Sequence, residues 1–213
     1  MPRNLTDPLL EHRERIPRAF YERDALVVAR QLIGAVLVCG DRAARIVETE
    51  AYRGPTDLAC HAKVGVTKRT KTLYGPPGHA YVYLIYGMYD CFNVVCFGEG
   101  KGHAALVRAV EPIVGVDAAV RTDGPGRLTR ALGITRRDDT TDLVLGDRIH
   151  LSPRTTTKRP RIAVSARVGV GYAGPWAEEP WRFYDADSRH VSRPAARSIG
   201  LGVVTAPASP RRR

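Results

Sequence analysis

The chain of 213 residues is long enough for one large domain or two small ones, and its 44% hydrophobic residues supply a substantial core. Its 33 Lys and Arg outnumber 22 Asp and Glu, and the net charge of +11 favours a polyanionic partner, with nucleic acid the first to consider. No stretch approaches the roughly 20 apolar residues that span a bilayer, and the N-terminus has no apolar signal region, so we expect a cytoplasmic protein without a membrane partner.

Residues 1–15 are polar and charged and are predicted to form an irregular arm. The hydrophobic spacing and turn residues that follow predict, in chain order, a helix over 21–32, strands over 35–38 and 44–50, a hairpin over 80–97, a strand over 104–110, a short helix over 114–121, a helix opening at Gly124-Pro125-Gly126, and strands over 143–151 and 161–170. The simplest layout is one mixed α+β domain over residues 16–202, with strands paired largely antiparallel, followed by a flexible basic tail over 203–213.

The hairpin predicted over residues 80–97 has an unusual turn. β-branched and aromatic residues fill both strands, and the turn at Tyr86-Gly87-Met88 carries an aromatic, apolar tip in place of Asn-Gly or Asp-Gly. Composition alone favours a hairpin that is buried in the core. The alternative is a wedge that enters another molecule, such as the base stack of a nucleic acid.

The sequence lacks the usual metal and cofactor motifs. Its six histidines show no HExxH or paired Cys/His spacing, and no phosphate-binding glycine loop joins a strand to a helix, so we expect neither a metal nor an organic cofactor. The four cysteines have no CxxC spacing and are predicted to be free buried thiols, with a Cys91–Cys96 bridge across the hairpin as the alternative.

Two carboxylates lie near the end of the strand predicted over 44–50. Glu48 and Glu50 share one face of that strand, and Tyr52 continues the same face. Spacing alone favours a pair of solvated carboxylates. The alternative is a Glu held among aromatic residues that acts as a general base and activates water. Such a Glu, near tyrosines and basic loops, would suit a hydrolase that takes a base out of a nucleic-acid stack.

Several long motifs occur in a fixed order through the chain. They are Arg45-Ile46-Val47-Glu48-Thr49-Glu50-Ala51-Tyr52-x-Gly54-Pro55-x-Asp57, His61, Tyr81-Val82-Tyr83-x-Ile85-Tyr86-Gly87-Met88-Tyr89-x-Cys91-x-Asn93, Leu106-Val107-Arg108-Ala109-x-Glu111-Pro112, Gly124-Pro125-Gly126-Arg127-Leu128, Arg167-Val168-Gly169-Val170-Gly171, Ala173-Gly174 and Arg182-Phe183-Tyr184. Over about residues 17–192, the chain closely resembles the alkyladenine (3-methyladenine) DNA glycosylase family, in its compact bacterial form. The resemblance implies a single domain with a curved, mainly antiparallel sheet, flanking helices and a protruding hairpin.

That resemblance implies a monofunctional base-excision enzyme. Such an enzyme flips an alkylated or deaminated purine (3-methyladenine, 7-methylguanine, hypoxanthine or ethenoadenine) out of double-stranded DNA and hydrolyses its N-glycosidic bond. Glu50 matches the family's general base, which deprotonates the attacking water, and Arg108 matches the residue that helps to hold that water. No cofactor is implied, and we expect a monomer that acts on nucleoid DNA.

The resemblance also implies a base pocket and a wedge. Tyr52, His61 and Tyr83 match the walls of the pocket, and His61 would also hydrogen-bond the base edge. Asn93 matches the residue that crowds the 2-amino group of guanine. Tyr86 matches the wedge that fills the gap left by the flipped nucleotide.

One loop departs from the family's pattern. Where the family commonly reads Thr-x-Arg-Asn, this chain reads Thr67-Lys68-Arg69-Thr70, which puts any role specific to that Asn in doubt. We still expect Thr67, Lys68 and Arg69 to contact the DNA backbone. Two other functional classes stay open: a non-catalytic DNA-damage-binding protein on the same fold, and an RNA-binding protein suggested by charge alone.

Overall fold

The computed structural model describes residues 14–154, 156–157 and 159–192. Within these ranges, eight strands form one sheet in which all paired neighbours are antiparallel. Six strands follow the order β3-β4-β5-β2-β1-β6, and β8 pairs with both β2 and β7 beside this path. The strands are β1 (Val36–Cys39), β2 (Arg42–Arg53), β3 (Ala80–Ile85), β4 (Tyr89–Cys96), β5 (His103–Val114), β6 (Ile149–Ser152), β7 (Ile162–Ser165) and β8 (Arg182–Asp185). The predicted mixed α+β class with an antiparallel sheet is confirmed.

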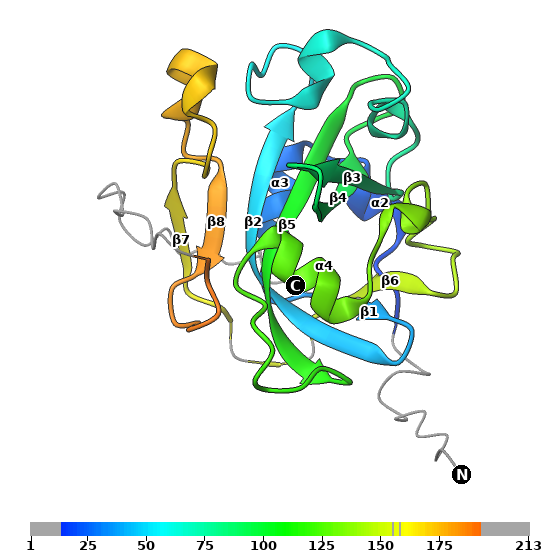
Figure 1. Ribbon diagram of the computed structural model, residues 1–213, viewed down its shortest axis with the longest axis vertical. Helices are drawn as coiled ribbons and strands as arrows, with labels where there is room; N and C mark the ends of the chain where they lie inside the picture. Colours follow the sequence, from blue (N-terminus) through cyan, green and yellow to red (C-terminus); the bar gives the residue numbers. More distant parts are fainter. Residues whose placement is uncertain (1–13, 155, 158, 193–213) are drawn as a thin grey trace, which may run out of the picture.

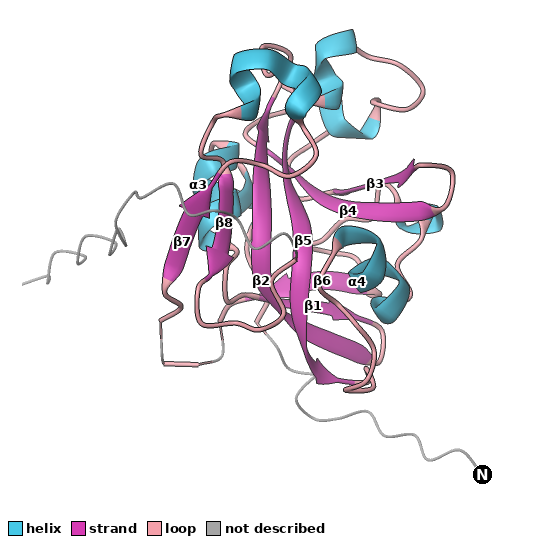
Figure 2. Ribbon diagram, turned by 60° about the vertical axis from the view of Figure 1, so that its left-hand side comes forward, coloured by secondary structure: helices cyan, strands magenta, loops and turns pink. Residues whose placement is uncertain are grey.

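The long strands β2 and β5 form the centre of the fold (Figure 1). In Figure 2, β3 and β4 run across the direction of β2 and β5, so the sheet curls strongly. The register between β2 and β5 passes from Ile46↔Val110 to Glu48↔Ala109 and then to Thr49↔Val107, so it skips Val47 and Arg108. Such a bulge twists both strands locally and changes the direction of the side chains beside it.

Two short helices precede the sheet where the sequence predicts one helix over 21–32. α2 (Arg18–Tyr21) ends at Glu22, and α3 (Ala25–Gln31) begins after Asp24. The Asp24 carboxylate accepts a hydrogen bond from the Leu26 amide at 2.9 Å, and this N-cap starts a new helix. The predicted start was therefore wrong, whereas the apolar face of α3 packs against β2 and β5 as the spacing predicts.

The third helix, α4 (Pro125–Leu132), confirms the prediction at Gly124-Pro125-Gly126, with Pro at its first turn and Gly133 in a left-handed C-cap. The short helix predicted over 114–121 was wrong. β5 instead continues to Val114, and the chain then turns at Gly115, whose φ is 70°. A side chain at Gly115 would collide with the Asp41 carbonyl in the β1–β2 turn, so the sharp turn there needs a glycine.

The predicted hairpin is present as β3 and β4. Val82 and Phe92 are buried in the core, while Tyr86 is 80% exposed and Met88 is 68% exposed at the tip. The prediction of a hairpin buried in the core is therefore confirmed for the base of the hairpin and wrong for its tip. Tyr86 and Gly87 both have positive φ, 53° and 72°, and a tyrosine in this left-handed region is strained.

Other predicted strands are shorter than the sequence suggested. The strand over 143–151 is reduced to β6, and the strand over 161–170 is reduced to β7. The four cysteines are free and buried, as predicted. The predicted tail over 203–213 and all of the predicted arm except residues 14 and 15 lie outside the described residues. Within those described residues, no helix is long and apolar enough to cross a membrane.

Short 3₁₀ helices occur in the connecting loops, four of them within the described ranges. They are η1 (His61–Val64), η2 (Thr72–Tyr74), η3 (Arg136–Asp138) and η4 (Gly171–Ala177). The loops that contain η1 and η4 lie next to each other, since the Tyr172 hydroxyl in η4 donates to the Ala59 carbonyl at 3.2 Å. The two loops form one wall beside the sheet.

Candidate active site

A cavity of about 560 Å³ opens between the β3–β4 hairpin, β5, the start of α4 and the wall formed by the η1 and η4 loops. Most of the site residues predicted from the sequence gather here. Those that line the cavity are Tyr52, His61, Tyr83, Tyr86, Asn93 and Arg108. Glu50 is fully buried behind this lining, and Thr67, Lys68 and Arg69 do not line the cavity.

One side of the cavity is aromatic. The rings of His61 and Tyr83 lie edge to face with centroids 4.5 Å apart, and the centroids of Tyr81 and Tyr83 are 5.2 Å apart. The Tyr81 hydroxyl lies 3.0 Å from His61 Nδ1 and fixes the orientation of the imidazole. Asn93 donates from Nδ2 to the Tyr81 carbonyl at 3.0 Å, which ties it to the same wall. A flat ring fits such a surface.

Burial lowers the pKa of His61 to about 4, and the neighbouring cations Arg69 and Lys63 lower it further in the same direction. The imidazole is therefore neutral near pH 7 and offers one donor and one acceptor. A neutral ring can read the edge of a base without repelling a cationic ligand.

The lowered pKa of His61 makes a prediction about stability. Between pH 6.5 and about 4, the unfolded chain binds a proton at His61 that the folded chain does not, so the free energy of unfolding falls as pH falls through this window. We expect urea unfolding of His61→Gln to lose this part of the pH dependence. The direct measurement is an NMR titration of the His61 ring, and a midpoint near 6.5 would contradict the prediction.

Glu50 on β2 lies at the base of the cavity and is held by three groups. Its Oε1 accepts from the Val168 amide at 2.7 Å and lies 3.4 Å from Arg108 Nη1, and its Oε2 accepts from the Tyr52 hydroxyl at 2.9 Å. Glu48 and Glu50 are both fully buried, so the expectation of a solvated pair was wrong. A buried carboxylate next to cavity-lining groups is suited to acid–base chemistry.

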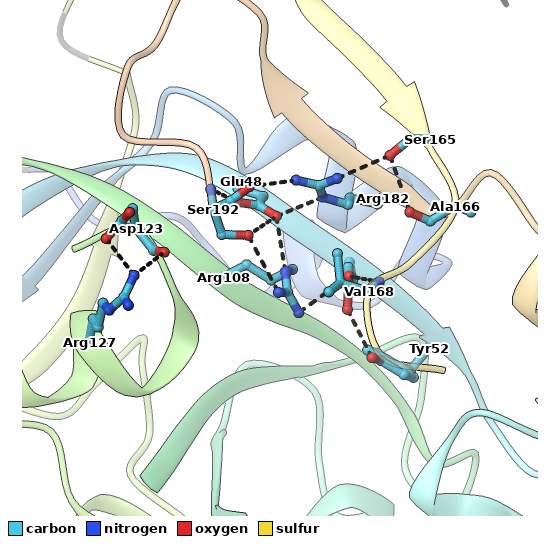
Figure 3. Close-up of polar contacts among 11 residues, drawn as sticks. Glu48, Tyr52, Arg108, Asp123, Arg127, Ser165, Ala166, Val168, Arg182 and Ser192 are labelled. Carbon is cyan, nitrogen blue, oxygen red and sulfur yellow. Dashed lines mark hydrogen bonds and ion pairs between the residues drawn. The ribbon is translucent and has the colours of Figure 1, made fainter. Parts of the chain in front are cut away.

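Arg108 on β5 joins the two carboxylates. Its Nε donates to Glu48 at 2.9 Å, as Figure 3 shows. Its Nη1 lies 3.4 Å from Glu50 Oε1. Burial alone would lower the pKa of Arg108, but Glu50 and Glu48 outweigh it and raise the pKa, so the guanidinium stays charged. Burial also raises the pKa of Tyr52 well above its usual value, and Glu50 adds to this, so the hydroxyl stays protonated and can donate.

The basic loop over residues 67–70 lies before the hairpin, and its contact with the DNA backbone stays a prediction. Thr70, where the family commonly has Asn, donates from its hydroxyl to the Gly65 carbonyl at 2.8 Å and is buried. The Arg69 guanidinium lies 5.4 Å from the centroid of the Tyr83 ring and donates to the Leu84 carbonyl at 3.2 Å. Arg69 thus lies against Tyr83 of the aromatic wall, and both Arg69 and Lys68 are exposed.

Sequence reasoning missed several residues of the cavity. Tyr89, Arg127, Arg130, Val168, Tyr172 and Ser192 also line it. The amphipathic pattern of α4 placed Arg127 and Arg130 on one basic face, which is the signal that could have found them. Val168, Tyr172 and Ser192 come from loops that carry no periodic signal.

Two further observations limit the chemistry of the cavity. Burial raises the pKa of the Cys91 thiol to about 11, so this cavity-lining cysteine is protonated and a poor nucleophile near pH 7. In the part of the chain that the structure describes, no group of three or more His, Cys, Asp and Glu could hold a metal ion. Glu50, a buried carboxylate that accepts a hydrogen bond from the cavity-lining Tyr52, is the candidate for the reactive group.

Comparisons with known proteins identify the family of the chain. The sequence profile of the family described as "Methylpurine-DNA glycosylase (MPG)" matches residues 19–189. The chain belongs to the methylpurine-DNA glycosylase family. It is therefore related to hydrolases of N-glycosyl bonds that act on DNA and serve its repair. This confirms the resemblance seen in the sequence motifs.

Curated relatives match most of the chain and most of their own length. One from Myxococcus xanthus (strain DK1622) is 53% identical over 182 residues, covering 84% of this chain and 93% of the relative. One from Legionella pneumophila (strain Corby) is 48% identical over 183 residues, covering 84% of this chain and 98% of the relative. Both carry the name "Putative 3-methyladenine DNA glycosylase". The family match over residues 19–189 thus includes all eight strands of the described sheet and every cavity-lining residue except Ser192.

Proposed function

We propose that this methylpurine-DNA glycosylase flips an alkylated or deaminated purine out of duplex DNA and hydrolyses its N-glycosidic bond with a water activated by Glu50. The observation that carries the proposal is the buried Glu50 carboxylate, hydrogen-bonded to Tyr52 at the base of a cavity with an aromatic wall. The substrate class is the one named above: 3-methyladenine, 7-methylguanine, hypoxanthine and ethenoadenine. One chain supplies every group that the proposed reaction uses, so we expect the enzyme to act as a monomer. Because its substrate is DNA, we expect it to work at the nucleoid.

In the proposed reaction, water attacks the anomeric carbon of the flipped nucleotide as the bond to the purine breaks. Glu50 takes the proton from the water, and its negative charge stabilises the oxocarbenium-like sugar. Arg108 lines the cavity beside Glu50 and helps to hold the water. Since Glu50 is fully buried, the water reaches it from the cavity side, between Tyr52 and Arg108. A purine methylated at N3 or N7 is cationic and already a good leaving group, so for these lesions water activation and orientation are the main tasks of the enzyme.

The base pocket selects by stacking and by shape. Tyr52, His61 and Tyr83 receive the flipped base, and electron-rich rings attract a cationic purine more strongly than a neutral one. The neutral His61 imidazole hydrogen-bonds the base edge. Asn93 is fixed by its bond to Tyr81 and crowds the 2-amino group of guanine. Normal bases are thus disfavoured by weaker stacking and poorer fit.

The proposal is tested by incubating the full-length protein with duplexes that carry one hypoxanthine or one ethenoadenine. Free base should appear, and strand cleavage should follow only after alkali, because a monofunctional enzyme leaves an intact abasic site. Strand cleavage without alkali would contradict the monofunctional mechanism. If the protein binds the lesions but releases no alkylated or deaminated purine, the enzyme proposal fails and the damage-binding alternative takes its place.

The exposed tip of the hairpin makes a second prediction under this proposal. Tyr86→Ser should weaken affinity for a lesion duplex about tenfold, because stacking of an aromatic side chain on bases contributes about 1–3 kcal/mol. The matched control is Leu145→Ser, since Leu145 is 74% exposed but does not line the cavity. Fluorescence anisotropy with labelled duplex measures both variants, and an unchanged affinity for Tyr86→Ser would exclude a wedge at this position.

A further inference from the structure

Glu48, two residues before Glu50 on β2, receives four hydrogen bonds on a carboxylate that has no exposed surface. Its Oε1 accepts from Arg108 Nε at 2.9 Å, Arg182 Nε at 2.7 Å and Ser192 Oγ at 2.8 Å. Its Oε2 accepts from the Ser192 amide at 2.6 Å. We call Glu48, Arg108, Arg182 and Ser192 the Glu48 cluster; Figure 3 shows how they converge.

The Glu48 cluster connects three strands and a later loop to the cavity. Glu48 lies on β2, Arg108 on β5 and Arg182 on β8, and Ser192 follows β8 in the chain. Arg108 and Ser192 line the cavity, whereas Glu48 and Arg182 do not. Glu48 therefore affects the site only through the side chains that it holds.

Arg108 is shared unequally between its two carboxylates. Its Nε is 2.9 Å from Glu48, but its Nη1 is 3.4 Å from Glu50. A buried guanidinium needs a nearby counter-charge. Without the charge of Glu48, Arg108 would close onto Glu50, the other buried carboxylate beside it. A tight pair would occupy Glu50 Oε1 and make that carboxylate a weaker base, since a close cation stabilises its charged form.

We propose that Glu48 is a positioning residue that holds Arg108 back from Glu50 and so keeps the Glu50 carboxylate available to the attacking water. This inference rests on the proposed function and deepens it. Ser192 supports the same arrangement, because its hydroxyl donates to Glu48 at 2.8 Å and accepts from Arg108 Nη2 at 3.4 Å. The segment after β8 that carries Ser192 is thereby part of the proposed active site.

The first test is Glu48→Gln, which keeps the shape of the side chain and removes its charge. We expect single-turnover release of hypoxanthine to slow by about 10- to 100-fold, the range for losing a hydrogen bond to a charged group. Affinity for a duplex that contains an abasic-sugar mimic should stay within about threefold of wild type. A slower rate of base release with unchanged affinity would indicate a positioning role, because damage to the fold would lower both.

The chain offers a matched control on the same three strands. Arg45 on β2 bonds to Glu111 on β5 and to Asp185 on β8, so this group repeats the arrangement of the Glu48 cluster with the charges reversed. None of its members lines the cavity. Glu111 is 39% exposed, whereas Glu48 is fully buried, so the two groups share their strands and not their burial. Glu111→Gln removes a carboxylate charge outside the cavity and should release hypoxanthine at the wild-type rate.

A double-mutant cycle tests whether Glu48 acts through Arg108. In an Arg108→Ala background, Glu48→Gln should cause no further loss of rate, because the side chain that it positions is gone. A further loss as large as that in the wild-type background would overturn the proposal. An equal fall in rate and in affinity for Glu48→Gln alone would also overturn it.

Ser192→Ala provides a test if Glu48→Gln does not fold. This variant removes one hydroxyl from the Glu48 cluster and should slow base release about threefold to tenfold with unchanged affinity. An unchanged rate would count against the proposal. If the wild-type protein releases no base, the proposed function fails instead, so the two failures are told apart by the wild-type measurement.

Discussion

Glu50→Gln is expected to slow base release by about 100- to 10,000-fold, the range for removing a general base. The amide keeps the shape of the carboxylate and can still accept from the Val168 amide, which lies 2.7 Å from Glu50 Oε1. It cannot take a proton from water. Lesion binding should therefore stay close to wild type, and single-turnover kinetics with a parallel binding titration measures both quantities.

The control for this variant is Glu99→Gln, which removes a carboxylate from an exposed position outside the cavity lining. It should leave both base release and lesion affinity unchanged. If Glu50→Gln lost lesion binding together with turnover, or changed the near-ultraviolet circular dichroism of the free protein, Glu50 would be a structural residue. The general-base assignment would then have to be withdrawn.

Arg167→Leu is expected to lower the free energy of unfolding by about 3–5 kcal/mol, the cost of leaving one member of a buried ion pair without its partner. Arg167 and Asp57 form two hydrogen bonds of 2.6 and 2.9 Å, and neither side chain is exposed. Arg167 also donates to the Ala51 and Trp176 carbonyls, each at 3.0 Å, and so fastens the loop after β7 to β2. Thermal unfolding should show a Tm lower by about 6–20 °C.

The matched control is the ion pair between Arg161 and Asp187, whose side chains are 54% and 46% exposed. Arg161→Ala also removes an arginine that bonds to an aspartate, but water screens this pair, so the loss should stay below about 1 kcal/mol. Equal falls in the free energy of unfolding for Arg167→Leu and Arg161→Ala would contradict the prediction. They would show that the buried ion pair with Asp57 stabilises the fold no more than the exposed pair does.

The main features of the fold could be predicted from periodicity and turn residues. The β3–β4 hairpin, β2 and α4 were predicted because β-branched residues, the tip glycine and Gly-Pro-Gly give strong local signals. The break between α2 and α3 could have been predicted from the N-cap at Asp24. The overlong strands at β6 and β7, and the missed β8, have another cause: strand ends depend on available neighbours rather than on local sequence.

The candidate site was predictable where its residues lie in long motifs, as for Glu50, His61 and Tyr83. Burial of Glu48 was not, because it depends on Arg108 and Arg182 arriving from two other strands. No sequence signal marks the register skip at Val47 and Arg108 either. Because of this skip, the side chains of β2 and β5 do not alternate regularly between the two faces of the sheet. Ser192 enters the cavity through tertiary packing alone.

At Tyr86, the residue that would give the most stable turn differs from the residue that the proposed activity requires. A tyrosine at φ 53° carries strain of about 1–3 kcal/mol, which glycine, or to a lesser degree asparagine, would relieve. Protein engineering guided by melting temperature alone would therefore favour replacing Tyr86. The replacement would remove the ring that the proposed mechanism inserts into DNA. The turn of this hairpin is therefore less stable than a glycine would make it, but it carries an aromatic side chain that is 80% exposed.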